Sequence, residues 1–386
     1  MFKGVFIDDK EDEKKYAELL SNNSSGQLNI EFCLPEHEVT ELAGHLIDQH
    51  YDFAAIDFRL DEVPIKDAEG GGQKNKYRAS ALAQQIRDRA IDQPSSDLPL
   101  ILLSQEDYIK RIFHADSTAE DLFDLVISKE ELVSAKPLAL AASRIASLAE
   151  AYKTIQANFT KNNNKPVAPS VLLGLDSHEA EMVLNHQAIR AIAKIQYPHQ
   201  IISKVMALLI QRPGILLSDE HLLARLGVSP DSPNVPQLKA KLFDLKLSYS
   251  GLLCEGWPRW WWHRIETWGK EALGSSLGSL SGTERTAKLS NTLQIALKPA
   301  ASKWSNSSDE YFWVACSSCD HPTELKYSVL GYDANYQPFL EPSRICWYCI
   351  QTGAYESRDL VIDDSDESLA EKIRNGKIQQ QTQMPS

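Results

Sequence analysis

The sequence predicts an α/β fold at the N-terminus, followed by a mainly helical region and a small β module. Four short apolar runs alternate with amphipathic stretches of helical periodicity. The apolar runs are residues 4–7, 53–56, 98–103 and 122–127, and the helical stretches are residues 14–20, 40–50, 79–90 and 132–148. Because strand and helix alternate, the chain should form a doubly wound parallel sheet.

Each apolar run ends close to a polar side chain. Asp8 and Asp9 follow the first run, Asp57 the second, Ser104 the third and Lys129 the fourth. Any one of these residues alone could simply cap a helix or line a loop. Together they should share the C-terminal edge of the sheet, where open α/β folds bind ligands.

This set of residues suits phosphoryl transfer. Three carboxylates offer the oxygen ligands that Mg²⁺ prefers, and an aspartate beside such a metal can attack phosphorus. A lysine and a hydroxyl can then hold the phosphoryl oxygens through charge-assisted hydrogen bonds.

Four motifs in the first 150 or so residues are specific enough to suggest a family. FIDDK, YDFAAIDFRL, LPLILLS and DLVISK resemble, in this order, the site motifs of a response-regulator receiver domain of bacterial two-component signalling. The resemblance implies a five-stranded sheet, phosphorylation of Asp57, and Mg²⁺ held by Asp8, Asp9 and Asp57. It also implies that Ser104 and Lys129 bind the phosphoryl group, which a histidine kinase or phosphotransfer protein would donate.

The sequence departs from the receiver pattern at three places. Glu130 follows Lys129 where proline is usual, and Val126 stands where the fifth strand usually carries an aromatic switch residue. Both changes weaken the expected coupling between Ser104 and that residue. The loop at residues 61–76 is long and contains three consecutive glycines, which favours a solvated insertion over a gate above Asp57.

Length and charge limit the function further. A chain of 386 residues should contain two or three domains. We expect a cytoplasmic location and no membrane contact, because no apolar stretch approaches the ~20 residues of a membrane span and no signal peptide opens the chain. The net charge of −13 argues against nucleic acid as the partner of the whole protein.

A heptad-like pattern predicts that the last receiver helix continues beyond the receiver. Its apolar positions are Leu138, Ala141, Ile145, Leu148, Tyr152, Ile155 and Phe159. Such a helix could form a homodimer or pack within a monomer. The polar, proline-containing segment 161–169 predicts a linker, so the first domain should span residues 1–160.

The region 170–305 is predicted to be a helical, Trp-rich domain. Ser218 should cap a helix at 219–226 that Gly227 ends. A following helix at 235–247 has the rhythm of a helix-turn-helix, with Lys239, Lys241 and Lys246 available, although a packing role is favoured. Segment 274–282 is predicted to be a flexible connection.

Five tryptophans lie within residues 256–268, beside three basic residues. Three of them are consecutive and cannot all face one core, so we expect a surface for a protein partner at Trp260, Trp261 and Arg264. A nucleobase platform and a purely core role are the alternatives.

Two Cys-x-x-Cys pairs predict a zinc ribbon at residues 306–360. Cys316, Cys319, Cys346 and Cys349 supply four thiolates for a closed, structural Zn²⁺ site. Disulfides are the competing interpretation, and His321 is a spare ligand. Cys33 and Cys254 should be plain thiols, and residues 361–386 a disordered tail.

These features predict a response regulator whose C-terminal half contacts a protein effector, as an adaptor or effector-control subunit would. The alternative is a DNA-binding transcriptional regulator, which should bind duplex DNA with a steep salt dependence. The sequence offers little support for an enzymatic output, so no activity beyond phosphoryl transfer to Asp57 is expected.

Overall fold

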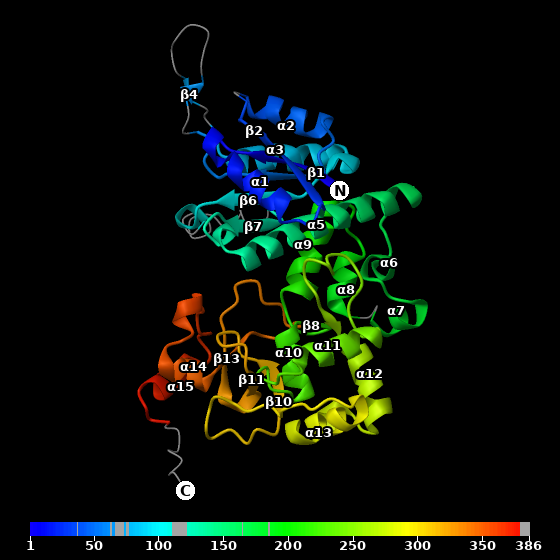
Figure 1. Ribbon diagram of the computed structural model, residues 1–386, viewed down its shortest axis with the longest axis vertical. Coiled ribbons are helices and arrows are strands. Elements are labelled where there is room, and N and C mark those ends of the chain that lie inside the picture. Colours follow the sequence, from blue (N-terminus) through cyan, green and yellow to red (C-terminus); the bar gives the residue numbers. More distant parts are fainter. Residues whose placement is uncertain are drawn as a thin grey trace. The chain divides into compact units, whose positions relative to one another are not determined.

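The computed structural model describes residues 1–36, 38–61, 64–65, 73–74, 77–109, 122–163, 165–183 and 186–378 (Figure 1). The chain forms two compact units. Unit 1 comprises Met1–Met206 and Ser250–Trp257, and unit 2 comprises Ala207–Tyr249 and Pro258–Ser386. In the described part of the chain, no helix is long and apolar enough to cross a membrane.

Unit 1 is built on a five-stranded parallel sheet, as predicted. Its strands are β1 (Phe2–Ile7), β2 (Leu28–Cys33), β3 (Phe53–Ile56), β6 (Leu100–Ser104) and β7 (Leu125–Ser128). Their spatial order is β2-β1-β3-β6-β7. The direction of winding therefore reverses between β1 and β3, and ligands bind beyond the strand ends at such a switch point.

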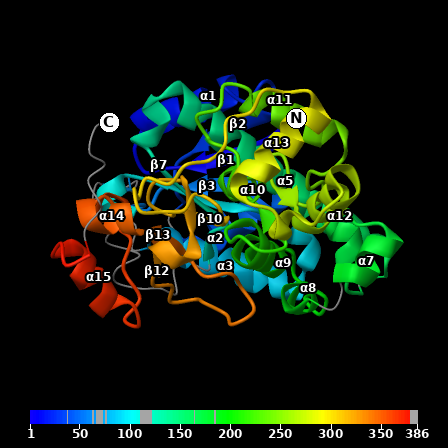
Figure 2. The ribbon, with the colours of Figure 1, turned by 90° about the horizontal axis from the view of Figure 1, so that it is seen from below.

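Helices cover both faces of this sheet. Helices α1 (Lys15–Asn22) and α5 (Ala135–Lys161) pack on one face, and α2 (Val39–Asp48) and α3 (Ala79–Asp92) pack on the other (Figure 2). Strand β3 is buried on both faces, which explains its unbroken apolar sequence. Gly4 faces the ring of Phe53 so closely that an added Cβ would lie 2.1 Å from it.

Short elements connect these helices and strands. They are η1 (Glu11–Lys14), η2 (Pro94–Ser96), η4 (Glu131–Val133), and the antiparallel pair β4 (Pro64–Ile65) and β5 (Gln73–Lys74). The pair β4–β5 lies in the predicted long loop at 61–76. Its three glycines, Gly70, Gly71 and Gly72, lie outside the described residues, so the solvated insertion favoured over a gate stays a prediction.

The continuous helix predicted after Lys129 is confirmed. Helix α5 has 27 residues, and all seven apolar positions of the heptad-like pattern are buried. It contacts α9 (Pro198–Val205), which follows α6 (Pro169–Leu173), α7 (Ser177–Val183) and α8 (Gln187–Ile192). This burial favours packing within one chain, and a homodimer through α5 would need another face of the helix.

The predicted linker is not the boundary between the two units. Residues 161–169 lie inside unit 1, which continues to Met206 and gains Ser250–Trp257 from later in the chain. In that segment Gly256 lies against α5, where an added Cβ would come within 2.9 Å of Ser147 Cβ. Trp257 packs beside Arg144 of α5, with its ring centroid 5.3 Å from the guanidinium carbon.

Unit 2 begins with helices around one apolar core. Its elements are the π-helical turn η5 (Met206–Ile210), β8 (Leu216–Leu217), α10 (Asp219–Leu226), α11 (Val235–Asp244), β9 (Trp260–Trp261), α12 (Trp262–Leu273), η6 (Leu277–Ser279) and α13 (Gly282–Leu293). The predicted start and end of α10 are confirmed. Ser218 Oγ accepts a hydrogen bond from His221 N, and Gly227 ends the helix at a φ of 71°.

One further expectation for unit 2 is corrected, and one agrees with the structure. The segment 274–282 is folded, because Leu277 is fully buried and Ser281 forms a capping box with Glu284 at the start of α13. On α11, Lys239 pairs with Asp219 at 2.6 Å and Lys241 donates to Leu293 O. Both lysines thus have partners within unit 2, in line with the packing role favoured for this helix.

The tryptophan-rich segment does not present the expected partner surface. Trp260 and Trp261 are 6% and 0% exposed in β9, which pairs with β8, and Trp260 Nε1 donates to Asp219 at 2.7 Å. Arg264 donates to two backbone carbonyls, those of Lys246 and Ser248. The prediction failed because both faces of β9 are covered: Trp260 lies in the apolar core against which Trp262 also packs, and Trp261 packs against Tyr249 and His263.

The rest of unit 2 consists of two antiparallel β-hairpins and short helices. The hairpins pair β10 (Phe312–Ala315) with β11 (Pro322–Glu324) and β12 (Ser328–Leu330) with β13 (Arg344–Cys346). The helical segments are η7 (Leu325–Tyr327), α14 (Trp347–Thr352), η8 (Glu356–Arg358) and α15 (Glu367–Arg374).

Candidate functional site

The five residues predicted at the C-terminal edge of the sheet lie together, and four are in direct contact. Lys129 Nζ is 2.7 Å from Asp8 Oδ2 and 2.8 Å from Asp57 Oδ1. Ser104 Oγ donates to the same Asp57 oxygen at 3.2 Å. Asp9 follows Asp8 and is 3% exposed. Parallel strands bring these residues together although they are far apart in the sequence.

Burial and mutual repulsion change the acidity of this site. Burial, followed by the charge of Asp57, raises the pKa of Asp8 to about 6, although Lys129 opposes the shift. Burial alone would lower the pKa of Lys129, but Asp57 and Asp8 outweigh it and raise that pKa. The site therefore holds a permanent ammonium among carboxylates that carry an excess of negative charge.

A third carboxylate also contacts Lys129. Glu13, on η1, lies 2.9 Å from Lys129 Nζ through Oε2 and 2.9 Å from Lys15 Nζ through Oε1. Burial favours a higher pKa for Glu13, but the hydrogen bonds from Lys15 and Lys129 outweigh it and lower the pKa. Sequence reasoning missed this residue, because one acidic residue within the charged run at residues 10–15 carries no distinguishing signal.

Glu130 has a structural role beside the site. Its Oε2 accepts hydrogen bonds from Ser128 Oγ at 2.6 Å and from Glu106 N at 3.1 Å. Glu106 lies two residues after Ser104, so Glu130 ties the end of β7 to the segment that follows β6. Val126 is partly buried against the core shared with α2 and α3.

The donor chemistry at this edge fits Mg²⁺, because Asp8, Asp9 and Asp57 offer only hard oxygen ligands. The charge of Asp57, which together with the larger effect of burial raises the pKa of Asp8, would also favour a cation. The oxygens of these three carboxylates do not all lie within 4.8 Å of one another. Within the described residues, the sole cluster of potential ligands whose atoms all lie within 4.8 Å of one another is formed by four cysteines.

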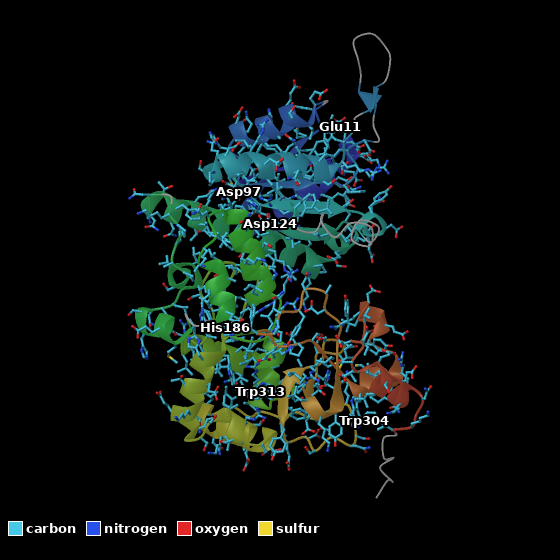
Figure 3. All side chains as sticks on the ribbon, turned by 180° about the vertical axis from the view of Figure 1, so that it is seen from behind. Glu11, Asp97, Asp124, His186, Trp304 and Trp313 are labelled. Carbon is cyan, nitrogen blue, oxygen red and sulfur yellow. The ribbon has the colours of Figure 1, made fainter. Side chains whose placement is uncertain are left out.

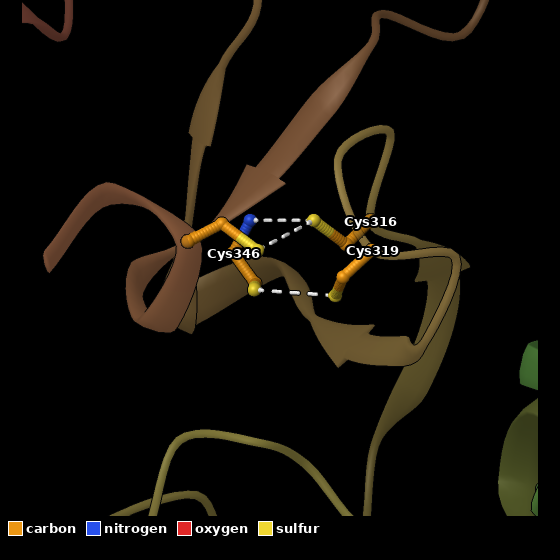
Figure 4. Close-up of side chains that lie close together, drawn as sticks. Cys316, Cys319 and Cys346 are labelled. Atoms are coloured by element: carbon orange, nitrogen blue, oxygen red, sulfur yellow. Dashed lines mark hydrogen bonds between the residues drawn. The ribbon is translucent and has the colours of Figure 1, made fainter. Parts of the chain in front are cut away.

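That cluster consists of Cys316, Cys319, Cys346 and Cys349, as predicted. Cys316 Sγ lies 3.9 Å from Cys349 Sγ, and Cys319 Sγ lies 3.9 Å from Cys346 Sγ. Four thiolates around Zn²⁺ at ~2.3 Å would be about 3.8 Å apart. All four thiols are free, and Figure 4 shows three of them turned toward one another. The separations thus match a tetrahedral metal site and exclude disulfide bonds.

The fold supplies the cysteines in two pairs. Cys316 and Cys319 lie in the turn between β10 and β11, while Cys346 ends β13 and Cys349 lies in α14. Cys346 N also donates to Cys316 Sγ at 3.2 Å, which joins the two pairs. His321 is directed elsewhere, because its Nδ1 lies 2.8 Å from Cys319 O.

The predicted disordered tail is corrected over residues 361–378. Ile362 forms a bridge with Gly331, and α15 buries Ala370 and Ile373 in the same apolar core as the cysteines. The prediction followed the acidic and glutamine-rich composition, although residues 369–378 have a weakly helical pattern. Residues 379–386 lie outside the described part of the chain.

The long segment between the two cysteine pairs is anchored within unit 2. Arg212 pairs with Asp333, and Arg225 Nη2 lies 2.5 Å from Glu341. The guanidinium carbon of Arg225 also lies 4.7 Å and 4.8 Å from the ring centroids of Trp262 and Trp313. These contacts account for a spacing longer than that of a minimal zinc ribbon, and they hold the β module against α10 and α12.

His221 in α10 provides a pH-dependent stability prediction. Burial, then the charges of Arg225 and Arg259, lower the pKa of His221 to about 4 from its usual 6.5. The unfolded chain therefore binds a proton between pH 6.5 and 4 while the folded chain does not, so stability falls as the pH drops through this range. The loss should reach at most about 3 kcal/mol.

This effect is measured by urea unfolding of unit 2, followed by tryptophan fluorescence between pH 7 and 4.5. The unfolding free energy of His221→Gln should fall less steeply with decreasing pH than that of the wild type. Both proteins contain the same cysteines, so the comparison removes the effect of cysteine protonation. Equal slopes for the two proteins would contradict the assigned shift.

Comparison with known proteins adds no family, since neither a family model nor a curated protein matches this chain.

Proposed function

We propose that unit 1 is a phosphoryl-accepting regulatory domain of the response-regulator type, with Asp57 as the acceptor. The observation that carries the proposal is the contact of Lys129 and Ser104 with one oxygen of Asp57 at the switch point of the sheet. These are the groups needed to hold an acceptor and then its phosphoryl oxygens.

Each residue of the site has a role in this proposal. An Asp57 carboxylate oxygen attacks phosphorus, the bond from phosphorus to the donor breaks, and the leaving group keeps that electron pair. Lys129 and Ser104 bind oxygens of the transferred group, which makes Ser104 the element that responds to it. Asp8, Asp9 and Asp57 would hold Mg²⁺, which supplies positive charge for the phosphoryl oxygens.

We further propose that unit 2 is the output half and contacts a protein effector. Zn²⁺ held by the four cysteines would be structural, because four protein ligands close the coordination sphere. Lys239 and Lys241 are engaged within unit 2, which disfavours α11 as a DNA-reading helix. A duplex-DNA binding assay at several salt concentrations separates the two outputs, since a DNA regulator would bind tightly at low salt.

The proposed acceptor is tested by incubating the purified protein with acetyl phosphate and Mg²⁺ and measuring intact mass. The wild type should gain one phosphoryl group, and Asp57→Asn should lose this reaction by on the order of 100-fold or more, since it lacks the nucleophile. Asp61→Asn is the matched control, because Asp61 is near in the chain but pairs with Arg59 at 2.6 Å.

Equal phosphorylation of wild type and Asp57→Asn would place the acceptor elsewhere. Absence of any gain in folded wild type, with acetyl phosphate and with phosphoramidate, would contradict the proposed function.

A further inference from the structure

The ammonium of Lys129 has all three of its hydrogens committed to carboxylates. Asp8 lies at 2.7 Å, Asp57 at 2.8 Å and Glu13 at 2.9 Å from Nζ. An ammonium group has three donors and no acceptor. A phosphoryl oxygen can therefore reach Lys129 only if one of these carboxylates leaves it.

The surroundings of the three carboxylates differ, and they single out Glu13. The side chain of Asp8 is 1% exposed, and its other oxygen accepts a hydrogen bond from Lys10 N at 2.9 Å. Asp57 is the acceptor and stays bonded to the phosphoryl group, so moving it away would also move the phosphoryl oxygens away from Lys129. Glu13 is 15% exposed, lies on the four-residue η1, and keeps a second cationic partner in Lys15. Its departure thus exposes no unpaired buried charge.

The net charge around Lys129 also indicates that Glu13 is the carboxylate that leaves. Asp8, Glu13 and Asp57 all contact the ammonium of Lys129, and a phosphoryl group would add ~1.5 to 2 further negative charges. Glu13 is ionised at neutral pH, since hydrogen bonds from Lys15 and Lys129 outweigh burial and lower its pKa. Its carboxylate therefore opposes the incoming anion directly.

We propose that Glu13 is a built-in anion that occupies the phosphoryl-binding position on Lys129 until Asp57 is phosphorylated. Glu13 is a positioning residue that acts through Lys129 and does not touch the reacting atoms. On phosphorylation its carboxylate moves away from Lys129 and stays paired with Lys15, with no proton gained or lost. This inference rests on the proposed function and adds a regulation of the same site.

The test compares Glu13→Gln with Glu11→Gln. Both variants remove one negative charge from the same short helix, but Glu11 is exposed and only Glu13 contacts Lys129. Binding of beryllofluoride, a phosphoryl analogue, is measured by ¹⁹F NMR at fixed Mg²⁺, together with the rate of phosphorylation at several acetyl phosphate concentrations.

Glu13→Gln should bind beryllofluoride more tightly by roughly threefold, as expected for loss of one partly exposed ion pair. Glu11→Gln should match the wild type, and Glu13→Asp, which restores the charge, should return toward it. The acetyl phosphate concentration at half-maximal rate should fall in Glu13→Gln more than the maximal rate changes.

The possible results separate this inference from the proposed function. Uptake of the analogue by all variants, with equal affinity for Glu13→Gln and Glu11→Gln, would overturn the role of Glu13 and leave Asp57 as the acceptor. Weaker binding by Glu13→Gln would likewise overturn it. Failure of the folded wild type to bind the analogue or to be phosphorylated would contradict both the role of Glu13 and the proposed function.

Discussion

Removal of the Zn²⁺ proposed for the four-cysteine site is expected to unfold residues 306–378 while the parallel sheet of unit 1 stays folded. Cys316, Cys346 and Cys349 belong to the apolar core that holds Val329, Ile350 and α15 together, so the ligands and the core coincide. The hairpins contribute only short strands. Binding of Zn²⁺ to such sites is worth about 10–16 kcal/mol, more than a module of this size can lose.

Hydrogen exchange with and without a strong chelator measures this effect along the chain. Protection should be lost in the two hairpins and α15 and kept in β1, β3 and β6. Cys349→Ala should reproduce the loss without chelator, whereas Cys254→Ala, which changes a thiol outside the cluster, should not. Metal analysis should confirm that zinc is gone. If the module nevertheless stays protected, a structural role for the metal is contradicted.

Replacing Arg87 by Met is expected to destabilise unit 1 by about 3–5 kcal/mol, the usual result of removing one partner from a buried ion pair. Arg87 lies on α3 and pairs with Asp97 at 2.8 Å and Asp124 at 2.7 Å, two carboxylates that are 0% and 4% exposed. Asp97 and Asp124 are labelled in Figure 3. Tyr152 of α5 donates to Asp124, and His199 N donates to Asp97. The variant would leave two buried carboxylates without their main counter-ion.

The matched control is Arg89→Met, since Arg89 lies on the same helix and donates to Thr40 O at an exposed position. Chemical unfolding followed by circular dichroism should separate the two variants. Neutralising the partners in Arg87→Met/Asp97→Asn/Asp124→Asn should recover part of the loss. Equal stability of the two single variants would show that the buried network contributes little.

This network also explains why the sequence placed the domain boundary too early. The segment 161–169 is polar and contains proline, which is the usual composition of a linker. However, α9 packs on α5, and His199 contacts Asp97, which lies between η2 and β6. A contact between residues 102 positions apart leaves no local pattern, so it could not be predicted from composition.

The central strands and the four-cysteine cluster were predictable for simple reasons. Strands β3 and β6 are buried on both faces and therefore read as continuous apolar runs. The edge strand β2 alternates buried and exposed residues at its start, and no apolar run marked it. Cys-x-x-Cys pairs fix their ligands by local spacing, which is why all four cysteines were found.

Residues whose roles depend on tertiary contacts were missed or misassigned. Glu13 becomes notable only because Lys129, from the far end of the sheet, lies beside it. Trp260 and Trp261 were expected at a surface, yet β9 pairs with β8 and buries both. In each case the contact that determines the role is made with a residue that is distant in the sequence and of a common type.

Chemical location of the phosphoryl group tests the central proposal most directly. An acyl phosphate on aspartate is reduced by borohydride to homoserine, which peptide mass spectrometry locates at a single residue. After treatment with acetyl phosphate and Mg²⁺, the wild type should contain homoserine at position 57 and at no other aspartate. Homoserine at another position, or none in folded protein under any phosphodonor, would contradict the assignment of Asp57 as the acceptor.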